Sequence, residues 1–400
     1  MRMVHKYGGS SVATLDKIEA IARHIAELHR QGHELVVVCS AMGKTTNGLI
    51  AMAEKISDAP SKRELDALLS TGEIQTVTLM AMALQKLGCD AVSMTGFQSG
   101  FITNEVHSRA FIKEVRTDRI ERCLSEGKIV VAAGFQGITE GGDITTLGRG
   151  GSDTTAVALA AALGCRCEIY TDVDAVYTVD PRLYPEARAL KRISYEEMME
   201  MSACGAGVLE TRCVELAKKY GVELYLGRTL ETERKGTTVM AQEKIMFEDM
   251  PITGISIKDG CTIVSFPPME YASGNVAAIF ELIAQSRINL DIINQNLIDG
   301  KVAFSFSCPD AQADELCAAL SGNAALAELK PDIRSGYTQI SVVGVGMATH
   351  TGVAAKVFGV LADAGISYYQ ITTSEISISF TIDPHNKSKA VSVLSRAFEL

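Results

Sequence analysis

Short apolar runs alternate with longer amphipathic segments through the first half of the chain. The apolar runs that predict buried strands cover residues 35–39, 129–133 and 168–171. Helical periodicity covers residues 15–28, 61–87, 117–126 and 154–163. Apolar strands that alternate with helices are typical of a mainly parallel sheet with both faces covered by helices. The pattern therefore predicts an α/β fold, in which ligands gather at the carboxyl ends of the strands.

The last third of the chain contains an internal repeat at an offset of 78 residues, because Gly274, Phe280 and Ile288 recur as Gly352, Phe358 and Ile366. Each copy predicts a strand, a glycine turn, an amphipathic helix and a second strand. The expected strands are 262–266 and 302–308 in the first copy, and 339–343 and 376–382 in the second. Units of this kind resemble small ferredoxin-like regulatory modules. The two copies either brace the rest of the protein or form a ligand site or dimer interface, and the glycine turns favour the second interpretation.

A polar segment separates the two patterns and predicts a linker. We expect a first domain at residues 1–240, a linker at 241–251, one module at 252–332 and a second at 333–400. A strand near 252–258 is a candidate member of the second module instead of the first.

Composition and charge exclude several classes of protein. The apolar fraction is 47%, as in ordinary globular chains, and the longest apolar run, 156–163, is too short to cross a bilayer. Residues 1–5 lack the apolar region of a signal peptide, so we expect a cytoplasmic protein. The net charge of −10 argues against binding to nucleic acid. Neither nucleic acid nor a membrane is therefore an expected partner.

The ten cysteines are scattered and form no C-x-x-C pair. Only Cys165 and Cys167 are close, and two ligands do not make a zinc site. We interpret most of the cysteines as reduced core thiols, and we predict no protein metal site.

Two glycine-rich loops carry the candidate chemistry. Gly148-Arg149-Gly150-Gly151-Ser152-Asp153 leads into the alanine-rich helix, and Ser152 and Asp153 are good N-cap residues. A helix start with free N–H groups suits an anion, and the Arg149 guanidinium suits a carboxylate. An ordinary Gly-Ser loop is the alternative, but it gives no reason for the arginine.

The second loop is Lys6-Tyr7-Gly8-Gly9-Ser10-Ser11-Val12, ahead of the 15–28 helix. Its glycines allow close approach of the backbone to a phosphate, and Lys6 adds a positive charge that can neutralise a moving phosphoryl group. Neither loop is a Walker A motif, because the glycine that Gly43-Lys44-Thr45 would need five residues earlier is Val38.

These loops belong to a longer set of motifs that occur in a fixed order. The set also includes Ser40-Ala41-Met42-Gly43, Gly72-Glu73, Gly134-Phe135-Gln136-Gly137, Tyr170-Thr171-Asp172 and Val176-Tyr177-Thr178-Val179-Asp180-Pro181-Arg182. With the terminal repeat, the set resembles the aspartokinases of the amino-acid kinase superfamily over essentially the whole chain. The resemblance implies an N-terminal amino-acid-kinase fold with two C-terminal ACT modules. The implied reaction converts ATP and L-aspartate into ADP and 4-phospho-L-aspartate, the first step of lysine, threonine and methionine biosynthesis.

The resemblance also assigns site residues. The implied catalytic residues are Lys6 and Asp153, and ATP is the implied nucleotide, with Mg²⁺ bound mainly through it. The implied nucleotide site comprises Lys6, Tyr7, Gly8, Gly9, Ser10, Ser40, Thr171, Asp172, Tyr177, Asp180, Pro181 and Arg182. The implied aspartate site comprises Thr46, Glu73, Phe135, Arg149, Gly150, Gly151, Ser152 and Asp153. Three plainer alternatives are a solvated helix-end acid for Glu73, a simple N-cap for Asp153 and an ordinary turn at 180–182.

The ACT resemblance implies an amino-acid effector, lysine and/or threonine, and a homodimer or homotetramer formed through the modules. The candidate effector residues are Asn275, Asp291, Gln295, Asn296, His350, Thr351, Gly352, Ser374 and Glu375. For Ser374 and Glu375, a surface strand pair is the alternative. The first module departs from the family pattern at 267–275, while 348–352 in the second is closer to it.

A further departure concerns nucleotide binding, because Gly207 stands where the family usually has a lysine. Two other functions stay open besides aspartate kinase. One is a kinase of another small carboxylate such as acetylglutamate, against which the ACT pair and the Arg149 loop argue. The other is a catalytically weak amino-acid sensor, which the missing lysine supports.

Overall fold

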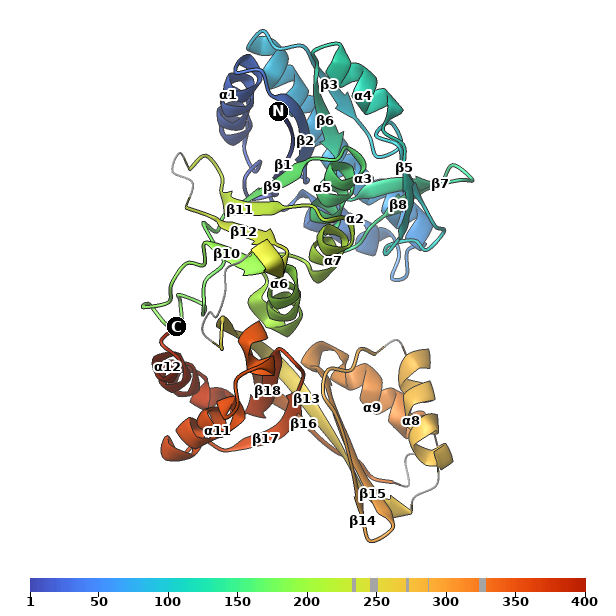
Figure 1. The fold of residues 1–400 in the computed structure, drawn as a ribbon. Helices are drawn as coiled ribbons and strands as arrows, with labels where there is room; N and C mark the ends of the chain where they lie inside the picture. Colours follow the sequence, from blue (N-terminus) through green and yellow to red (C-terminus); the bar gives the residue numbers. More distant parts are fainter. Residues whose placement is uncertain (232–234, 245–250, 271–272, 287, 324–328) are drawn as a thin grey trace. The chain divides into compact units, whose positions relative to one another are not determined.

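The computed structural model describes residues 1–231, 235–244, 251–270, 273–286, 288–323 and 329–400 (Figure 1). Its contacts divide the chain into two compact units. The first comprises Met1–Val176, Ala189–Met199 and Gly207–Phe247, and the second comprises Tyr177–Arg188, Glu200–Ala206 and Glu248–Leu400. The second unit thus includes two segments from within the first 240 residues. Most of the predicted linker, 245–250, lies outside the described residues.

An eight-stranded sheet forms the centre of the first unit, in the order β10-β12-β11-β9-β1-β2-β6-β3. Neighbouring strands are parallel except for β11 and β12. The strands are β1 (Arg2–Tyr7), β2 (Glu34–Cys39), β3 (Ala91–Met94), β6 (Ile129–Ala133), β9 (Arg166–Thr171), β10 (Arg192–Ser194), β11 (Leu224–Arg228) and β12 (Thr237–Met240). The predicted mainly parallel α/β sheet is confirmed.

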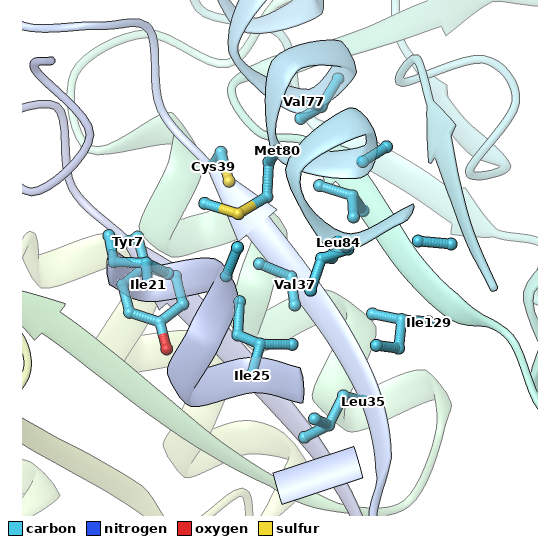
Figure 2. Close-up of a cluster of buried hydrophobic side chains, with 14 of the residues drawn as sticks. Tyr7, Ile21, Ile25, Leu35, Val37, Cys39, Val77, Met80, Leu84 and Ile129 are labelled. Atoms are coloured by element: carbon cyan, nitrogen blue, oxygen red, sulfur yellow. The ribbon is translucent and has the colours of Figure 1, made fainter. Parts of the chain in front are cut away.

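In the part of the first unit that the structure describes, the helices are α1 (Leu15–Arg30), α2 (Thr45–Ile56), α3 (Lys62–Lys86), α4 (Asp118–Ser125), α5 (Gly151–Ala162), α6 (Tyr195–Met201) and α7 (Thr211–Tyr220). Helices α1 and α3 bury one face of the central strands. Ile21, Ile25, Val37, Met80 and Leu84 pack together in this core (Figure 2). Because helices cover both faces, residues 35–38 of β2 are all fully buried, which explains the uninterrupted apolar run.

Helix α3 is long and apolar enough to cross a membrane by length and composition alone. Half of its most apolar window is buried within the protein, where Leu69, Val77, Met80 and Leu84 lie in the interior. We therefore interpret α3 as a core helix.

A smaller four-stranded sheet adjoins the site described below and has the order β5-β4-β7-β8. Its strands are β4 (Phe101–Thr103), β5 (Ile112–Val115), β7 (Gln136–Thr139) and β8 (Ile144–Thr146). Strands of three or four residues are too short for a clear alternation of polar and apolar positions, and the sequence pattern did not predict them.

The second unit contains a six-stranded antiparallel sheet in the order β14-β15-β13-β16-β18-β17. Its strands are β13 (Gly254–Glu270), β14 (Ile293–Ile298), β15 (Lys301–Pro309), β16 (Asp332–Val343), β17 (Tyr368–Thr373) and β18 (Ser377–Ile382). Its helices are α8 (Ser273–Gln285), α9 (Ala313–Gly322), α11 (Val353–Asp363) and α12 (Lys387–Ala397). Each repeat is therefore strand, helix, strand, strand, helix, and the edge strands and last helices go beyond the sequence pattern.

The repeat corresponds to two equivalent hydrophobic cores. Phe280 of α8 packs edge-on against Phe304 with 5.3 Å between ring centroids, and Phe358 of α11 packs in the same way against Phe380 at 5.9 Å. The long strand β13 contributes to both cores: Ile255 lies in the second core, and Val264 lies in the first. The modules therefore share a continuous sheet.

Candidate active site

The carboxyl ends of four parallel strands meet at one edge of the large sheet. Tyr7 at the end of β1 pairs in register with Cys39 of β2 and with Tyr170 of β9, and Cys39 pairs with Ala133 of β6. Of the residues that the sequence predicted for nucleotide and substrate, the loops that follow these strands contain Gly8, Gly9, Ser10, Ser40, Phe135 and Asp172. The fold thus gathers them where a parallel sheet places its ligands.

An ion pair joins the two glycine loops. Lys6, on the α5 side of β1, is 7% exposed, and its Nζ lies 2.6 Å from Oδ1 of Asp153 in the first turn of α5. An ammonium group held beside a helix start, whose first turn leaves N–H groups without intrahelical partners, offers hydrogen-bond donors to a phosphoryl group.

The start of α5 differs from the sequence prediction. Gly150 is the N-cap in a left-handed conformation (φ 65°), so Ser152 and Asp153 lie inside the first turn. The interpretation of Ser152 and Asp153 as N-cap residues is wrong, because the glycine turn begins the helix earlier. A Cβ at Gly150 would also collide with the side chain of Glu210. This earlier start places Asp153 within reach of Lys6.

The loop after β1 lies directly against the loop after β2. The N–H of Gly43 donates to the carbonyl of Gly9 at 3.0 Å, and a Cβ at Gly9 would lie 2.9 Å from the carbonyl oxygen of Ala41. A side chain at position 9 would therefore displace the backbone of the second loop. Ser40, at the start of the second loop, donates its N–H to the carbonyl of Tyr7 at 3.1 Å.

Glu73 of α3 brings a buried carboxylate to the same loops. Its Oε1 accepts the N–H of Ala41 at 3.1 Å, and its side chain is 3% exposed, so the alternative of a solvated helix-end acid is wrong. Burial raises the pKa of Glu73 to about 7, against the opposing effect of the Ala41 N–H. Within the described residues, its buried Oε2 has no hydrogen-bond partner. A buried oxygen of this kind is suited to a positively charged group on a ligand.

Phe135 connects the end of β6 to α5. Its backbone has φ 71°, its N–H donates to Oγ1 of Thr155 at 3.0 Å, and its carbonyl accepts from the N–H of Leu147 at 2.8 Å. A Cβ at Gly151 would lie 2.8 Å from the Phe135 ring, so the ring covers the first residue of the helix. These contacts hold an unusual backbone conformation at a predicted substrate residue.

Arg149 lies between Gly148 and Gly150 in the turn before α5. Its side chain is exposed, and it forms no hydrogen bond or ion pair with any residue that the structure describes. Arg212 of α7 donates from Nη1 to the carbonyl of Leu147 and from Nη2 to that of Ala110, each at 2.9 Å. Arg212 thus supports the backbone of the turn, while Arg149 leaves its guanidinium exposed to a ligand.

Comparison with known proteins identifies the family. The model of the amino acid kinase family matches residues 1–227, and an ACT domain model matches residues 340–398. The aspartokinase of Geobacillus stearothermophilus is 47% identical over 400 residues, which cover 100% of this chain and 97% of that protein. The chain belongs to the aspartokinase family.

Two solved structures share the fold. The crystal structure of E. coli aspartokinase III in complex with aspartate and ADP has a TM-score of 0.83 at 24% identity and covers 100% of both chains. The same protein in complex with lysine and aspartate has a TM-score of 0.78 at 24% identity and covers 99% of both chains. At this identity the likeness concerns the fold alone, and it confirms the predicted fold class.

The remaining residues that the aspartokinase resemblance implied for the nucleotide site lie partly in the first unit and partly in the second. Thr171 ends β9 and Asp172 follows it, beside the first glycine loop, since the N–H of Gly8 donates to the carbonyl of Tyr170 at 3.1 Å. Thr171 Oγ1 donates to Oδ1 of Asp172 at 2.9 Å. Ser10 is exposed at the tip of the first loop. Gly207, where the family usually has a lysine, is exposed with φ 64°.

Tyr177, Asp180, Pro181 and Arg182 belong to the second unit, whereas Lys6 belongs to the first. Nη2 of Arg182 lies 2.7 Å from Oδ2 of Asp180, and these hydrogen bonds lower the pKa of the Asp180 carboxyl. Thr46 lies in the first turn of α2 and is half-buried. The roles of these residues stay predictions.

The candidate effector residues of the second module lie at one end of the sheet. The N–H of Gly344 after β16 donates to the carbonyl of Ile376 before β18 at 2.9 Å, which joins the two connections that carry them. His350, Thr351, Gly352, Ser374 and Glu375 are all exposed there. Gly352 is the N-cap of α11.

The first module presents its candidates differently. Asp291 already pairs with Lys258, with 2.7 Å between Oδ2 and Nζ. Gln295 and Asn296 are exposed on the edge strand β14. Asn275 lies in the first turn of α8, and its side chain is outside what the structure describes.

The sequence patterns missed one polar residue near the site. Asp66 on α3 is fully buried and accepts four hydrogen bonds. Its distance of seven residues from Glu73 was the available signal, because that spacing places both carboxylates on one face of a helix.

Proposed function

We propose that this member of the aspartokinase family transfers the γ-phosphoryl group of ATP to the side-chain carboxylate of L-aspartate. The products are ADP and 4-phospho-L-aspartate. The observation that carries the proposal is the Lys6–Asp153 ion pair, 2.6 Å between Nζ and Oδ1, where the two glycine loops meet. Lys6 offsets negative charge on the transferring group, and Asp153 holds Lys6 in place.

The reaction joins two anions and needs no general base. The acceptor carboxylate has a pKa near 4 and is ionised at neutral pH. The protein must therefore position both reactants and reduce their repulsion. The backbone of the Gly8–Gly9 loop, the start of α5 and Lys6 are suited to this role.

The acceptor site is defined by groups of opposite charge. The buried Glu73 carboxylate suits the substrate ammonium, and the exposed guanidinium of Arg149 suits the α-carboxylate. Phe135, Thr46 and Ser152 complete the proposed site. Acetylglutamate has no ammonium group to neutralise Glu73, so this site favours aspartate over the alternative acceptor.

We propose ATP as the donor, with Mg²⁺ arriving on its phosphates. Within the described residues, no three His, Cys, Asp or Glu side chains gather into a metal site. Magnesium commonly binds through substrate phosphates with few protein carboxylates, and these residues fit that mode. When bound, the ion would neutralise phosphate charge.

A coupled assay of ADP release tests this function. Purified protein with ATP and Mg²⁺ is assayed with L-aspartate, with N-acetylglutamate and without an acceptor. Release that depends on aspartate supports the proposal. ADP release only with N-acetylglutamate would indicate a kinase of that acceptor. If neither compound raises ADP release above the acceptor-free reaction, the result would favour the amino-acid sensor.

We further propose feedback inhibition by lysine and/or threonine through the C-terminal modules. The exposed Glu375 and the start of α11 suit the ammonium and carboxylate of a free amino acid. E. coli aspartokinase III has been crystallised with lysine and aspartate.

We propose a homodimer or homotetramer that assembles through the same modules. Ile293 and Leu297 on the edge strand β14 are 48% and 61% exposed, and an edge with apolar side chains is suited to pairing. The mass measured by light scattering, with and without lysine or threonine, tests this assembly. We also propose a cytoplasmic location, which agrees with ten free cysteines.

A further inference from the structure

The buried carboxylate of Asp66, on the same helix as Glu73, accepts four hydrogen bonds. Its Oδ2 accepts the N–H of Ser108 at 2.8 Å, the N–H of Thr146 at 3.0 Å and a bond to Nδ1 of His107 at 3.1 Å. Its Oδ1 accepts the hydroxyl of Thr146 at 2.7 Å. A fully buried carboxylate is stable only with such partners.

These donors come from two segments that adjoin the turn of Arg149. Thr146 ends β8, three residues before Arg149. The carbonyl of Thr146 also accepts the N–H of Ala110 at 2.9 Å, which ties the 107–110 loop to the same strand. Ser108 has φ 68°, a conformation that needs support in a residue other than glycine. The Asp66 carboxylate provides this support.

The 107–110 loop in turn touches the arginine turn. A Cβ at Gly148 would lie 3.1 Å from the carbonyl oxygen of Ser108 and 3.5 Å from Cγ of Arg109. The path of contacts therefore runs from Asp66 to Ser108 and Thr146, and from both to Gly148 and Arg149. Arg149 itself has no partner within the described residues, so its position depends on the backbone that carries it.

We infer that Asp66 is a positioning residue for Arg149. It acts through the backbone of residues 108 and 146 and fixes the turn in which the guanidinium meets the acceptor carboxylate. The inference rests on the proposed function, because it takes the α-carboxylate of aspartate as the ligand of Arg149. It predicts an effect on aspartate and little effect on ATP, whose proposed residues in the first unit lie at the ends of β1, β2 and β9 or in the loops after them.

The test compares Asp66→Ala with Asp66→Asn in steady-state kinetics. Alanine leaves the loop donors without an acceptor, and misplacing a binding group by about 1 Å can cost a hundredfold in rate. We expect kcat/KM for aspartate to fall about ten- to a hundredfold through KM, with KM for ATP within about twofold. Asparagine keeps an acceptor oxygen for the N–H groups, and its amide can donate to the Thr146 hydroxyl, so we expect it to restore most of the aspartate affinity.

Glu197→Ala is the matched control. Glu197 is a buried carboxylate of α6 that accepts the N–H and hydroxyl of Ser194 at 3.2 and 2.7 Å. The substitution Glu197→Ala should lower the melting temperature without raising KM for aspartate. If Asp66→Ala does not fold, Thr146→Val removes only the hydroxyl donor, and we expect about a fivefold rise in KM for aspartate from one lost hydrogen bond.

Three outcomes are decisive. A higher aspartate KM in Asp66→Ala or Thr146→Val, with rescue by Asp66→Asn, supports the inference. If the wild type is active, the inference is overturned when these variants leave KM for aspartate unchanged. It is also overturned when they raise KM for aspartate and KM for ATP equally. A wild type that releases no ADP with aspartate contradicts the proposed function, and the inference fails with it.

Discussion

Asp66 and Glu73 lie seven residues apart on α3, and each buried carboxylate holds a different loop of the site. Glu73 accepts the N–H of Ala41 after β2, and Asp66 accepts the N–H of Thr146 at the end of β8. Between them, the carbonyl of Ser70 accepts a hydrogen bond from Nε2 of Gln136 at 2.9 Å. One face of a rigid core helix thus sets the relative positions of three segments that surround the proposed acceptor site.

Lys6→Ala is expected to reduce kcat far more than stability. The substitution removes the charge that offsets the transferring phosphoryl group, and comparable electrostatic groups contribute about a thousandfold in rate. Turnover at saturating ATP and the melting temperature are the measurements. Lys44→Ala, at an exposed lysine of the neighbouring loop, should keep wild-type turnover. Near-normal turnover in Lys6→Ala would remove Lys6 from this role.

Arg149→Lys is expected to raise KM for aspartate about ten- to a hundredfold, while ATP binding changes little. Lysine keeps the charge but loses the bidentate fork, and a charge-assisted hydrogen bond contributes about 1.5–3 kcal/mol. The control is Arg109→Lys, at an exposed arginine in the adjacent loop. If ATP affinity falls and the aspartate KM holds, then the anion at this turn is a phosphate, and the assignment is reversed.

Glu73 should make aspartate binding depend on pH. Its pKa is raised to about 7 by burial, and only the ionised form attracts the substrate ammonium. Below pH 7 the carboxyl is increasingly protonated, so kcat/KM for aspartate should fall toward a tenfold loss per pH unit, and above pH 7 it should level off. The measurement is a profile of kcat/KM from pH 5.5 to about 8.5.

The variant Glu73→Gln should lose both the affinity and this dependence, because the amide stays neutral throughout the range. Glu197→Gln, at another buried carboxylate, should keep the wild-type profile. A wild-type profile that is flat between pH 6 and 8 would contradict a binding role for Glu73 with this pKa.

Lysine or threonine is expected to inhibit the kinase through the second module. Coupling between an effector site and an active site is typically about 1–3 kcal/mol. Activity and melting temperature are titrated with lysine, threonine, methionine and diaminopimelate, singly and in pairs. Glu375→Ala should lose inhibition and keep basal activity, while Asp363→Ala at the end of α11 should keep both. If none of the four compounds has an effect, the repeat is a dimerisation scaffold.

The sequence predicted the elements that are long or fully buried. The strand at 129–133 has the predicted bounds, and the helix predicted at 61–87 is α3, Lys62–Lys86. The four short strands of the small sheet were not predicted, because their pairing depends on contacts between distant segments. The start of α5 was placed three residues late, because capping preference favoured Ser152 and Asp153 over the left-handed turn at Gly150.

The candidate site was predictable where its residues form local motifs. Lys6, Arg149 and Asp153 belong to such motifs, but their meeting depends on the register of β1 with the strands beside it. Asp66 belongs to no motif that the sequence singled out. Its role depends on donors about 40 and 80 residues away, which only the folded chain brings together.

Trapping the reaction product with hydroxylamine tests the central claim most directly. An acyl phosphate reacts with hydroxylamine to form a hydroxamate, so the wild type with MgATP and L-aspartate should produce aspartyl hydroxamate and ADP in equal amounts. Lys6→Ala should form it about a thousandfold more slowly, and N-acetylglutamate should give no hydroxamate. ADP release without hydroxamate from aspartate, or hydroxamate formed only from N-acetylglutamate, would contradict phosphoryl transfer to the aspartate side chain at this site.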